Sequence, residues 1–412
     1  MQNIKVSRRN FVGATAAIAA AAVPSSAGTT NRTADLEMRL ARHDLKNVYK
    51  EDLPTPCMVV DQEIFEANLR KMSSHCKTTG IHLRAHVKVH KSVEIAKRQI
   101  GLGAIGITCA TVAECELVSH AGISGVLLTR QPASKNNIER VIALARQDPS
   151  FGTVVDDPIV ADWLQQAAAT ENVKLRTVVD VYAGLTRHGI EPEQALDLAK
   201  KVDASKNLKF VGIMGYAGIA AHTHPWDKRL QRSKDDLAGT LETVALARKS
   251  GLPVEIVTGG STGTYNIDSE FQGLTELQAG SYIFMDTLYN VIGSKDGSPA
   301  YNDFGMSLTV LTTVISKRHP NRCTIDAGNK ALLKPTDQVK GRPEVKIENA
   351  GAEYGALLWN DGDREFKVGD RVEVYPSNLD MSTNVYDRYY VARGEQIVDV
   401  WPIMGRAGAA QR

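Results

Sequence analysis

Residues 81–92, IHLRAHVKVHKS, decide the fold. Regular alternation of apolar and nitrogen-bearing side chains predicts a β-strand with two unlike faces. One face would pack on helices through Leu83, Ala85, Val87 and Val89. The opposite face would carry His82, Arg84, His86, Lys88 and His90. Because a core strand is normally apolar on both faces, this row of basic groups indicates a buried or cleft-facing site for an anion.

Lys88, late in the predicted strand, is the candidate catalytic residue. The neighbouring cations Arg84 and Lys91, with any charged imidazole, disfavour its ammonium form. A free lysine amine is a nucleophile toward carbonyl carbons. A phosphate-binding or solvated basic strand without a covalent role accounts for the same residues equally well, so this stretch alone leaves both interpretations open.

The composition describes an ordinary soluble globular protein. The 412 residues suffice for two domains, or for one barrel with an appended domain. A formal charge of +2 and 43% hydrophobic residues argue for neither a nucleic acid nor an acidic partner. The five cysteines are scattered, odd in number and without a CxxC pair, so neither a disulfide framework nor a zinc site is expected.

Residues 1–28 are predicted to be a twin-arginine signal peptide. Arg8 and Arg9 precede Asn10 and Phe11, and the apolar run at 13–23 is too short to span a bilayer. Small residues at 24–27 follow, where a peptidase would cut. We expect a periplasmic protein without a stable membrane anchor; an ordinary secretory signal or a retained anchor is the alternative.

The remaining chain is predicted to form an α/β protein, a (β/α)8 TIM-type barrel at 53–300 followed by a mostly-β domain at 301–405. A polar lead-in at 29–52 precedes the barrel. Amphipathic helical stretches alternate with apolar strands predicted at 82–89, 105–109, 125–129, 153–155, 174–181, 208–216, 254–259 and 276–279. A Rossmann-like sheet is disfavoured, because no GxGxxG follows the first strand. After Tyr301 the runs are β-type and are broken by Gly, Pro and Asp.

In a parallel barrel, active-site residues gather where strands end. Three polar clusters follow predicted strands: Lys88 and His90, residues 180–189, and residues 258–265. In the third cluster, Gly260, Ser261, Thr262 and Gly263 would offer backbone N–H groups and hydroxyls to a phosphate, although such a loop is also typical of a plain turn. A lysine amine and a phosphate-binding loop across one barrel mouth suggest pyridoxal 5′-phosphate.

These motifs resemble, in order, the fold-type III pyridoxal-phosphate enzymes related to the alanine racemase barrel. The similarity is greatest to the branch with D-threonine aldolase, D-serine dehydratase and the enzymes of D-3-hydroxyaspartate. The branch pattern TP-x-x-V-x-D matches residues 55–61, and R-P-H-x-K-T-H-K matches 84–91, with Ala85 and Val89 as departures. A Gly-rich loop at 259–264, Q-x-G-x-Y-x-F-x-D at 278–286 and N-x-Y-D at 384–387 complete the match.

The resemblance implies a role for each matching residue. It implies that Lys88 is the Schiff-base lysine, that Arg187 lies beside the cofactor's phenolic oxygen, and that Tyr216 faces its pyridine nitrogen. It implies that residues 260–263 hold the phosphate and that His222 lies near the substrate hydroxyl, where a plain loop histidine is the alternative. Members of the group are dimers, so a homodimer is expected.

The chain departs from the family at the expected metal site. The resemblance implies a His-x-Asp or His-x-Cys pair just before N-x-Y-D, and here Asn378 and Asp380 take those positions. An amide oxygen binds hard ions such as Mn²⁺ or Mg²⁺ and is a poor zinc ligand. Either a harder ion binds weakly, or His222 and Asp380 act without a metal.

The resemblance implies a lyase that acts on small D-amino acids. An aldolase would cleave a D-threonine-like β-hydroxy amino acid to glycine and an aldehyde, with His222 or a metal-bound hydroxide taking the hydroxyl proton. The alternative is a D-serine or D-3-hydroxyaspartate dehydratase, which the loss of the metal histidine disfavours. A racemase is less expected, because no second acid or base can be placed. A non-catalytic pyridoxal-phosphate protein is the remaining alternative.

Overall fold

The computed structural model describes residues 32–332, 337–363 and 365–406. The chain divides into two compact units, Met1–Asp44 and Leu45–Arg412. The first unit contains helix α1 (Arg32–Ala41), and the predicted signal peptide lies outside the described residues. No helix in the described ranges combines the length and apolar character needed to cross a membrane.

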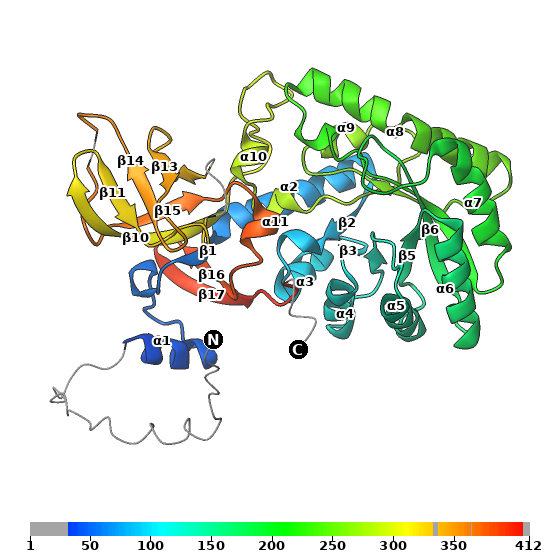
Figure 1. Ribbon diagram of the computed structural model, residues 1–412, viewed down its shortest axis with the longest axis horizontal. Helices are drawn as coiled ribbons and strands as arrows, with labels where there is room; N and C mark the ends of the chain where they lie inside the picture. Colours follow the sequence, from blue (N-terminus) through cyan, green and yellow to red (C-terminus); the bar gives the residue numbers. More distant parts are fainter. Residues whose placement is uncertain (1–31, 333–336, 364, 407–412) are drawn as a thin grey trace, which may run out of the picture. The chain divides into compact units, whose positions relative to one another are not determined.

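The second unit contains a closed parallel barrel, seen at the right of Figure 1. The described residues contribute eight barrel strands, which pair in sequence order with β9 closing on β2. The strands are β2 (His82–His86), β3 (Gly106–Cys109), β4 (Leu127–Leu128), β5 (Gly152–Val155), β6 (Leu175–Val181), β7 (Leu208–Gly215), β8 (Ile256–Gly259) and β9 (Glu276–Leu277). The predicted TIM-type barrel with a C-terminal β domain is confirmed.

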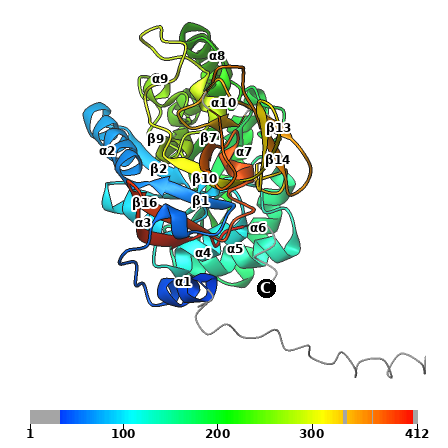
Figure 2. The same cartoon turned by 90° about the vertical axis from the view of Figure 1, so that its left-hand side faces the viewer.

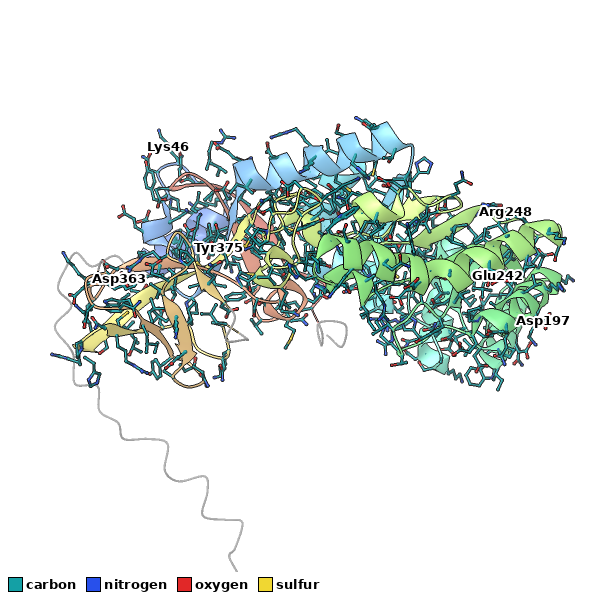
Figure 3. The ribbon with its side chains drawn as sticks, turned by 90° about the horizontal axis from the view of Figure 1, so that it is seen from above. Lys46, Asp197, Glu242, Arg248, Asp363 and Tyr375 are labelled. Carbon is teal, nitrogen blue, oxygen red and sulfur yellow. The ribbon has the colours of Figure 1, made fainter. Side chains whose placement is uncertain are left out.

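Amphipathic helices surround the strands. They are α2 (Gln62–Thr79), α3 (Val93–Gly101), α4 (Val112–His120), α5 (Lys135–Gln147), α6 (Pro158–Thr170), α7 (Pro192–Ala204), α8 (Trp226–Lys249), α9 (Tyr265–Asp268) and α10 (Thr287–Asn290). In α7 and α8 the apolar side chains face the strands, and exposed charged residues such as Asp197, Glu242 and Arg248 point outward (Figure 3). The amphipathic pattern of the sequence therefore reflects a layer of helices with one face on the strands and the other exposed to solvent.

The β domain is built on a nine-stranded sheet with the main order β13-β14-β11-β10-β1-β16-β17, and β15 pairs with β10 and β12. Its strands are β1 (Cys57–Asp61), β10 (Leu308–His319), β11 (Arg322–Ile325), β12 (Gln338–Val339), β13 (Lys346–Asn349), β14 (Gly355–Leu358), β15 (Arg371–Tyr375), β16 (Arg388–Arg393) and β17 (Gln396–Pro402). The short helix α11 (Leu379–Ser382) lies between β15 and β16.

Strand β1 gives this domain a segment from before the barrel. It runs antiparallel to β10 and parallel to β16, in the middle of the sheet (Figure 2). Four of its five residues are buried, so the apolar run at 57–60 forms an interior strand between β10 and β16. The structure therefore differs from the predicted boundary at residue 53, because the chain forms one strand of the β domain before it enters the barrel.

In residues 81–92 the β-strand is shorter than the alternation of apolar and basic side chains predicts. Strand β2 ends at His86, and Val87–Val89 form a 3-10 turn in which Lys88 N–H donates to His86 Nδ1 at 3.4 Å. Within the barrel, Arg84 donates to both carboxylate oxygens of Glu276, at 2.8 and 2.9 Å. The predicted strand over 82–89 is therefore too long, and its row of basic groups is interrupted, because Arg84 is paired with Glu276 and the turn redirects Lys88. Whether the stretch serves an anion stays a prediction.

Candidate active site

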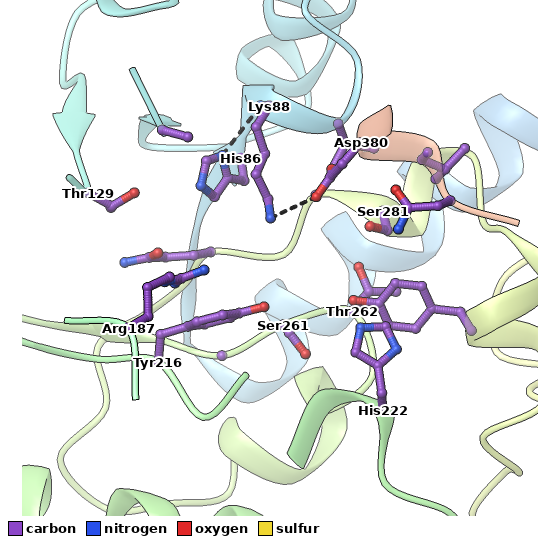
Figure 4. Close-up of a pocket in the computed structure, with 18 of the residues that line it drawn as sticks. His86, Lys88, Thr129, Arg187, Tyr216, His222, Ser261, Thr262, Ser281 and Asp380 are labelled. Atoms are coloured by element: carbon purple, nitrogen blue, oxygen red, sulfur yellow. Dashed lines mark hydrogen bonds and ion pairs between the residues drawn. The ribbon is translucent and has the colours of Figure 1, made fainter. Parts of the chain in front are cut away.

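A cavity of about 440 Å³ opens where the barrel strands end (Figure 4). Its walls come from the segments that follow β2, β3, β4, β6, β7, β8 and β9, and from residues 378–380 of the β domain. Among the predicted site residues, those that line it are Lys88, Arg187, Tyr216, His222, Gly260, Ser261, Thr262, Asn378 and Asp380. Gly263 is not among the lining residues. The structure brings the predicted residues together, and their roles stay predictions.

Lys88 projects into this cavity and forms an ion pair with Asp380, with 3.0 Å between Nζ and Oδ2 (Figure 4). Burial lowers the pKa of Lys88, but the charges of Asp380 and Tyr216 outweigh burial, so the pKa lies above the ordinary lysine value. The prediction of a free amine is thus wrong for the protein without cofactor. The reason is a carboxylate that is distant in sequence.

Lys91 joins the Lys88 turn to the β domain. Its backbone is left-handed, with φ 52°, and its ammonium donates to the Lys88 carbonyl and to Thr383 Oγ1, the latter at 3.2 Å. Burial lowers the pKa of Lys91, and the charge of Glu114 acts in the opposite direction. This buried lysine therefore holds α11, and with it Asp380, beside Lys88.

The loop after β8 has the properties of a phosphate site. The backbone N–H groups of Gly260 and Thr262 find no acceptor among the described residues. The loop is rigid, because Ser261 N–H donates to Thr264 Oγ1 at 3.2 Å and Thr262 Oγ1 accepts from Tyr282 N–H at 2.9 Å. A Cβ on Gly263 would lie 2.0 Å from the Ala221 carbonyl oxygen. Fixed, unpaired N–H donors fit a phosphate group.

Arg187 and Tyr216 form the wall opposite Lys88. The Arg187 guanidinium carbon lies 5.6 Å from the centre of the Tyr216 ring, and both side chains point into the cavity (Figure 4). Tyr216 immediately follows β7, and Arg187 lies in the loop after β6. A planar cation and a phenol facing a lysine across a cavity fit an aromatic aldehyde such as pyridoxal phosphate.

His222 lies in a 3-10 turn at Ala220–His222 and faces the open cavity, with its ring centre 4.4 Å from that of Tyr289. Desolvation by the surrounding protein lowers the pKa of His222, and the charge of Lys88 lowers it further, whereas the charge of Asp380 raises it. A neutral imidazole is therefore available at neutral pH to accept a proton.

The residues at the expected metal position already bind protein groups. The side-chain oxygen of Asn378 caps α11 by accepting from Met381 N–H at 3.1 Å, and Asp380 is paired with Lys88. Within the described ranges, only Asp156, Asp180 and His188 form a group of three or more potential His, Cys, Asp or Glu ligands, and Asp380 is not one of them. Asn378 Oδ1 and Asp380 Oδ2 therefore both already have protein partners.

The structure adds residues to the site that the sequence did not single out. Gln131, His188 and Tyr289 line the cavity, and Asp180 lies behind His188. Asp180 and His188 belong to the polar cluster at 180–189, so their position after a barrel strand was a usable signal. Gln131 also follows a barrel strand, β4, but no polar cluster marked that position, and Tyr289 lies in the short helix α10 without such a signal.

Two family models match the chain. The model described as alanine racemase, N-terminal domain, matches residues 60–288 and covers the barrel. The chain belongs to this family. A second model, described as a putative serine dehydratase domain, matches residues 307–392 in the β domain. Membership in the fold-type III pyridoxal-phosphate enzymes is therefore confirmed.

Members of known activity resemble the chain over most of its length. The 3-hydroxy-D-aspartate aldolase of Paracoccus denitrificans is 33% identical, with 88% of this chain and 94% of the relative covered. The D-threo-3-hydroxyaspartate dehydratase of Delftia sp. is 25% identical, over 85% of this chain and 97% of the relative. The crystal structure of D-threonine aldolase from Filomicrobium marinum aligns with a TM-score of 0.83 at 30% identity, covering 87% of this chain and 97% of that one. These relatives of the alanine racemase-like chain are all lyases.

Proposed function

We propose that this protein is a pyridoxal 5′-phosphate-dependent lyase that cleaves D-β-hydroxy-α-amino acids, D-threonine among them, to glycine and an aldehyde. The observation that carries the proposal is the convergence of Lys88, a phosphate-type loop and two proton acceptors, His222 and Asp380, on one cavity. The similarity to two aldolases supports the same reaction class.

The residues divide the work in a way that fits carbon–carbon cleavage. Lys88 would hold the cofactor, Arg187 its phenolic oxygen, and Gly260–Thr262 its phosphate, with Gly263 keeping the loop close to Ala221. When bound, pyridoxal phosphate supplies a sink for the electron pair released at Cα. His222 or Asp380 then accepts the β-hydroxyl proton as the Cα–Cβ bond breaks.

Asp380 offers a specific acceptor for that proton. Its Oδ1 atom is buried and has no hydrogen-bond partner among the described residues, while Oδ2 pairs with Lys88. A buried oxygen without a donor is unfavourable, and a substrate hydroxyl would satisfy it. The carboxylate therefore supports substrate binding and proton removal at the same position.

A dehydratase is the second candidate, because the β domain matches the putative serine dehydratase model and one relative is a D-threo-3-hydroxyaspartate dehydratase. Incubation with D-threonine, D-phenylserine, D-serine and both D-3-hydroxyaspartates separates the two candidates. Aldehyde with glycine supports the aldolase, and a 2-oxo acid with ammonia replaces it by the dehydratase. Cofactor absorbance without turnover on any of these amino acids would indicate a non-catalytic carrier and overturn the proposal.

The proposal includes a reaction without a divalent metal, because Asn378 caps α11 and Asp380 is paired with Lys88. We expect dialysis against EDTA to leave kcat within about twofold, since no step depends on a bound ion. Asn378→His is expected to create a site for Mn²⁺, measured by calorimetric titration, and to cost about 1 kcal/mol of stability through the lost cap.

Asn378→Ala is the matched control, because it loses the cap and provides no new ligand. The metal-free reaction is refuted if purified wild-type protein holds one divalent ion per chain and chelation removes activity that Mn²⁺ or Mg²⁺ restores.

We also propose a homodimer exported to the periplasm. The twin-arginine pattern at Arg8 and Arg9 supports export, and the dimers implied by the family resemblance support the assembly. Light scattering after size exclusion tests the dimer. Cell fractionation with an Arg8→Lys, Arg9→Lys variant tests the export route, and unchanged periplasmic accumulation would exclude it.

A further inference from the structure

A line of polar side chains runs from Arg187 along the cavity wall to the buried Asp180. Arg187 Nε donates to His188 Nε2 at 2.9 Å. The other ring nitrogen, His188 Nδ1, lies 2.6 Å from Asp180 Oδ2, and the same oxygen accepts from Gln131 Nε2 at 3.0 Å. Four side chains from three separate segments therefore form one connected series.

The chemistry of arginine fixes the proton positions along this series. A guanidinium only donates hydrogen bonds, so His188 Nε2 must be the accepting, unprotonated nitrogen. The single ring proton then resides on Nδ1 and points at the Asp180 carboxylate. His188 is thus held as the neutral Nδ1–H tautomer between the Arg187 guanidinium and the Asp180 carboxylate.

Asp180 is the buried anchor of the series. It is the penultimate residue of β6, with 2% of its surface exposed. Burial raises the pKa of Asp180, while the hydrogen bonds from His188 and Gln131 oppose this rise. Because an unpaired carboxylate at this depth is costly, those two donors are needed, and they in turn are fixed by it.

The loop geometry keeps His188 in register with Asp180. Gly189 has φ +103°, and a Cβ there would lie 2.7 Å from Tyr182 N. Its own N–H donates to Asp156 Oδ2 at 2.9 Å. Ile190 N–H donates to the Asp180 carbonyl at 2.9 Å, so the chain turns back onto the strand it has just left.

We infer that His188 is a positioning residue that aims Arg187 at the cofactor, with Asp180 and Gln131 as its support. The Nε atom of Arg187 is committed to His188, and its terminal nitrogens make no hydrogen bond to the described residues. They remain free over Tyr216 to meet the phenolic oxygen of a pyridoxal ring. This inference rests on the cofactor site of the proposed function and is independent of which substrate bond is broken.

The test uses the full-length apoprotein titrated with pyridoxal phosphate. Relative to wild type, we expect His188→Ala to raise the cofactor Kd by about tenfold, as for a lost hydrogen bond to a charged group, and to shift the absorbance maximum of the bound cofactor. His188→Gln can accept from Arg187 and donate to Asp180, so we expect its Kd within about threefold of wild type. His120→Ala, at an exposed helix end, is the control.

Each outcome decides the question. A wild-type Kd and spectrum in His188→Ala would overturn the positioning role, and so would equal losses in the Ala and Gln variants. Asp156, Asp180 and His188 also have the spacing of a cation site, so stoichiometric Mn²⁺ or Zn²⁺ binding that His188→Ala abolishes would replace the inference. Cofactor binding by wild type without any turnover would refute the proposed reaction and leave this inference standing, whereas no cofactor binding at all would refute both.

Discussion

Lys88→Ala is expected to lower kcat by roughly 10⁴-fold or more, because the only amine aimed into the described cavity near the phosphate-type loop would be lost. Borohydride reduction of wild-type protein should leave a pyridoxyl label on the peptide that contains Lys88, and the variant should carry none. Its apoprotein should unfold at a temperature close to that of wild type, since the side chain lies in a cavity and its removal frees Asp380 from one ion pair.

Lys97→Ala is the matched control, because Lys97 is an exposed lysine on the neighbouring helix α3. It should keep both the label and the activity. A label on any other peptide, or a Lys88→Ala variant with more than a few per cent of wild-type activity, would remove the basis of the cofactor site.

The barrel could be predicted because its signals are local. Each strand from β2 to β9 is a short apolar run next to an amphipathic stretch. This alternation can be recognised in the sequence without knowledge of tertiary contacts. The placement of β1 could not be predicted in this way. Residues 57–61 read as an extended segment just before the barrel, and only pairing with β10 and β16, both distant in sequence, assigns them to the other sheet.

The same distinction applies to the site. Lys88, Arg187 and the loop at 260–263 follow barrel strands, so position alone pointed to them. The charge state of Lys88 did not follow from its neighbours in sequence, because Asp380 reaches it from the β domain. The role of Asn378 as a helix cap was equally hidden, since it depends on the N–H of Met381 in a helix of a single turn.

His222→Ala is expected to lower kcat by about 10²- to 10⁴-fold while the absorbance of bound cofactor stays unchanged. The size follows from the loss of a positioned general base. The surrounding protein and then the charge of Lys88 lower the pKa of His222, so its basic form persists below the ordinary imidazole range. In wild type, kcat/KM should therefore stay flat as pH falls through 6.5 and decline only at more acidic pH.

The variant separates His222 from the other acceptor, Asp380. If the imidazole is the base, His222→Ala removes the acid decline from the pH profile of kcat/KM. Asp380→Asn then keeps that decline but raises KM, because the side chain at 380 no longer offers a carboxylate oxygen, Oδ1, to the substrate hydroxyl. The reverse pattern assigns proton removal to Asp380 and leaves His222 a wall residue packed on Tyr289. His319→Ala, an exposed histidine of the β domain, should change neither parameter, which ties any effect to the cavity and not to histidine loss in general.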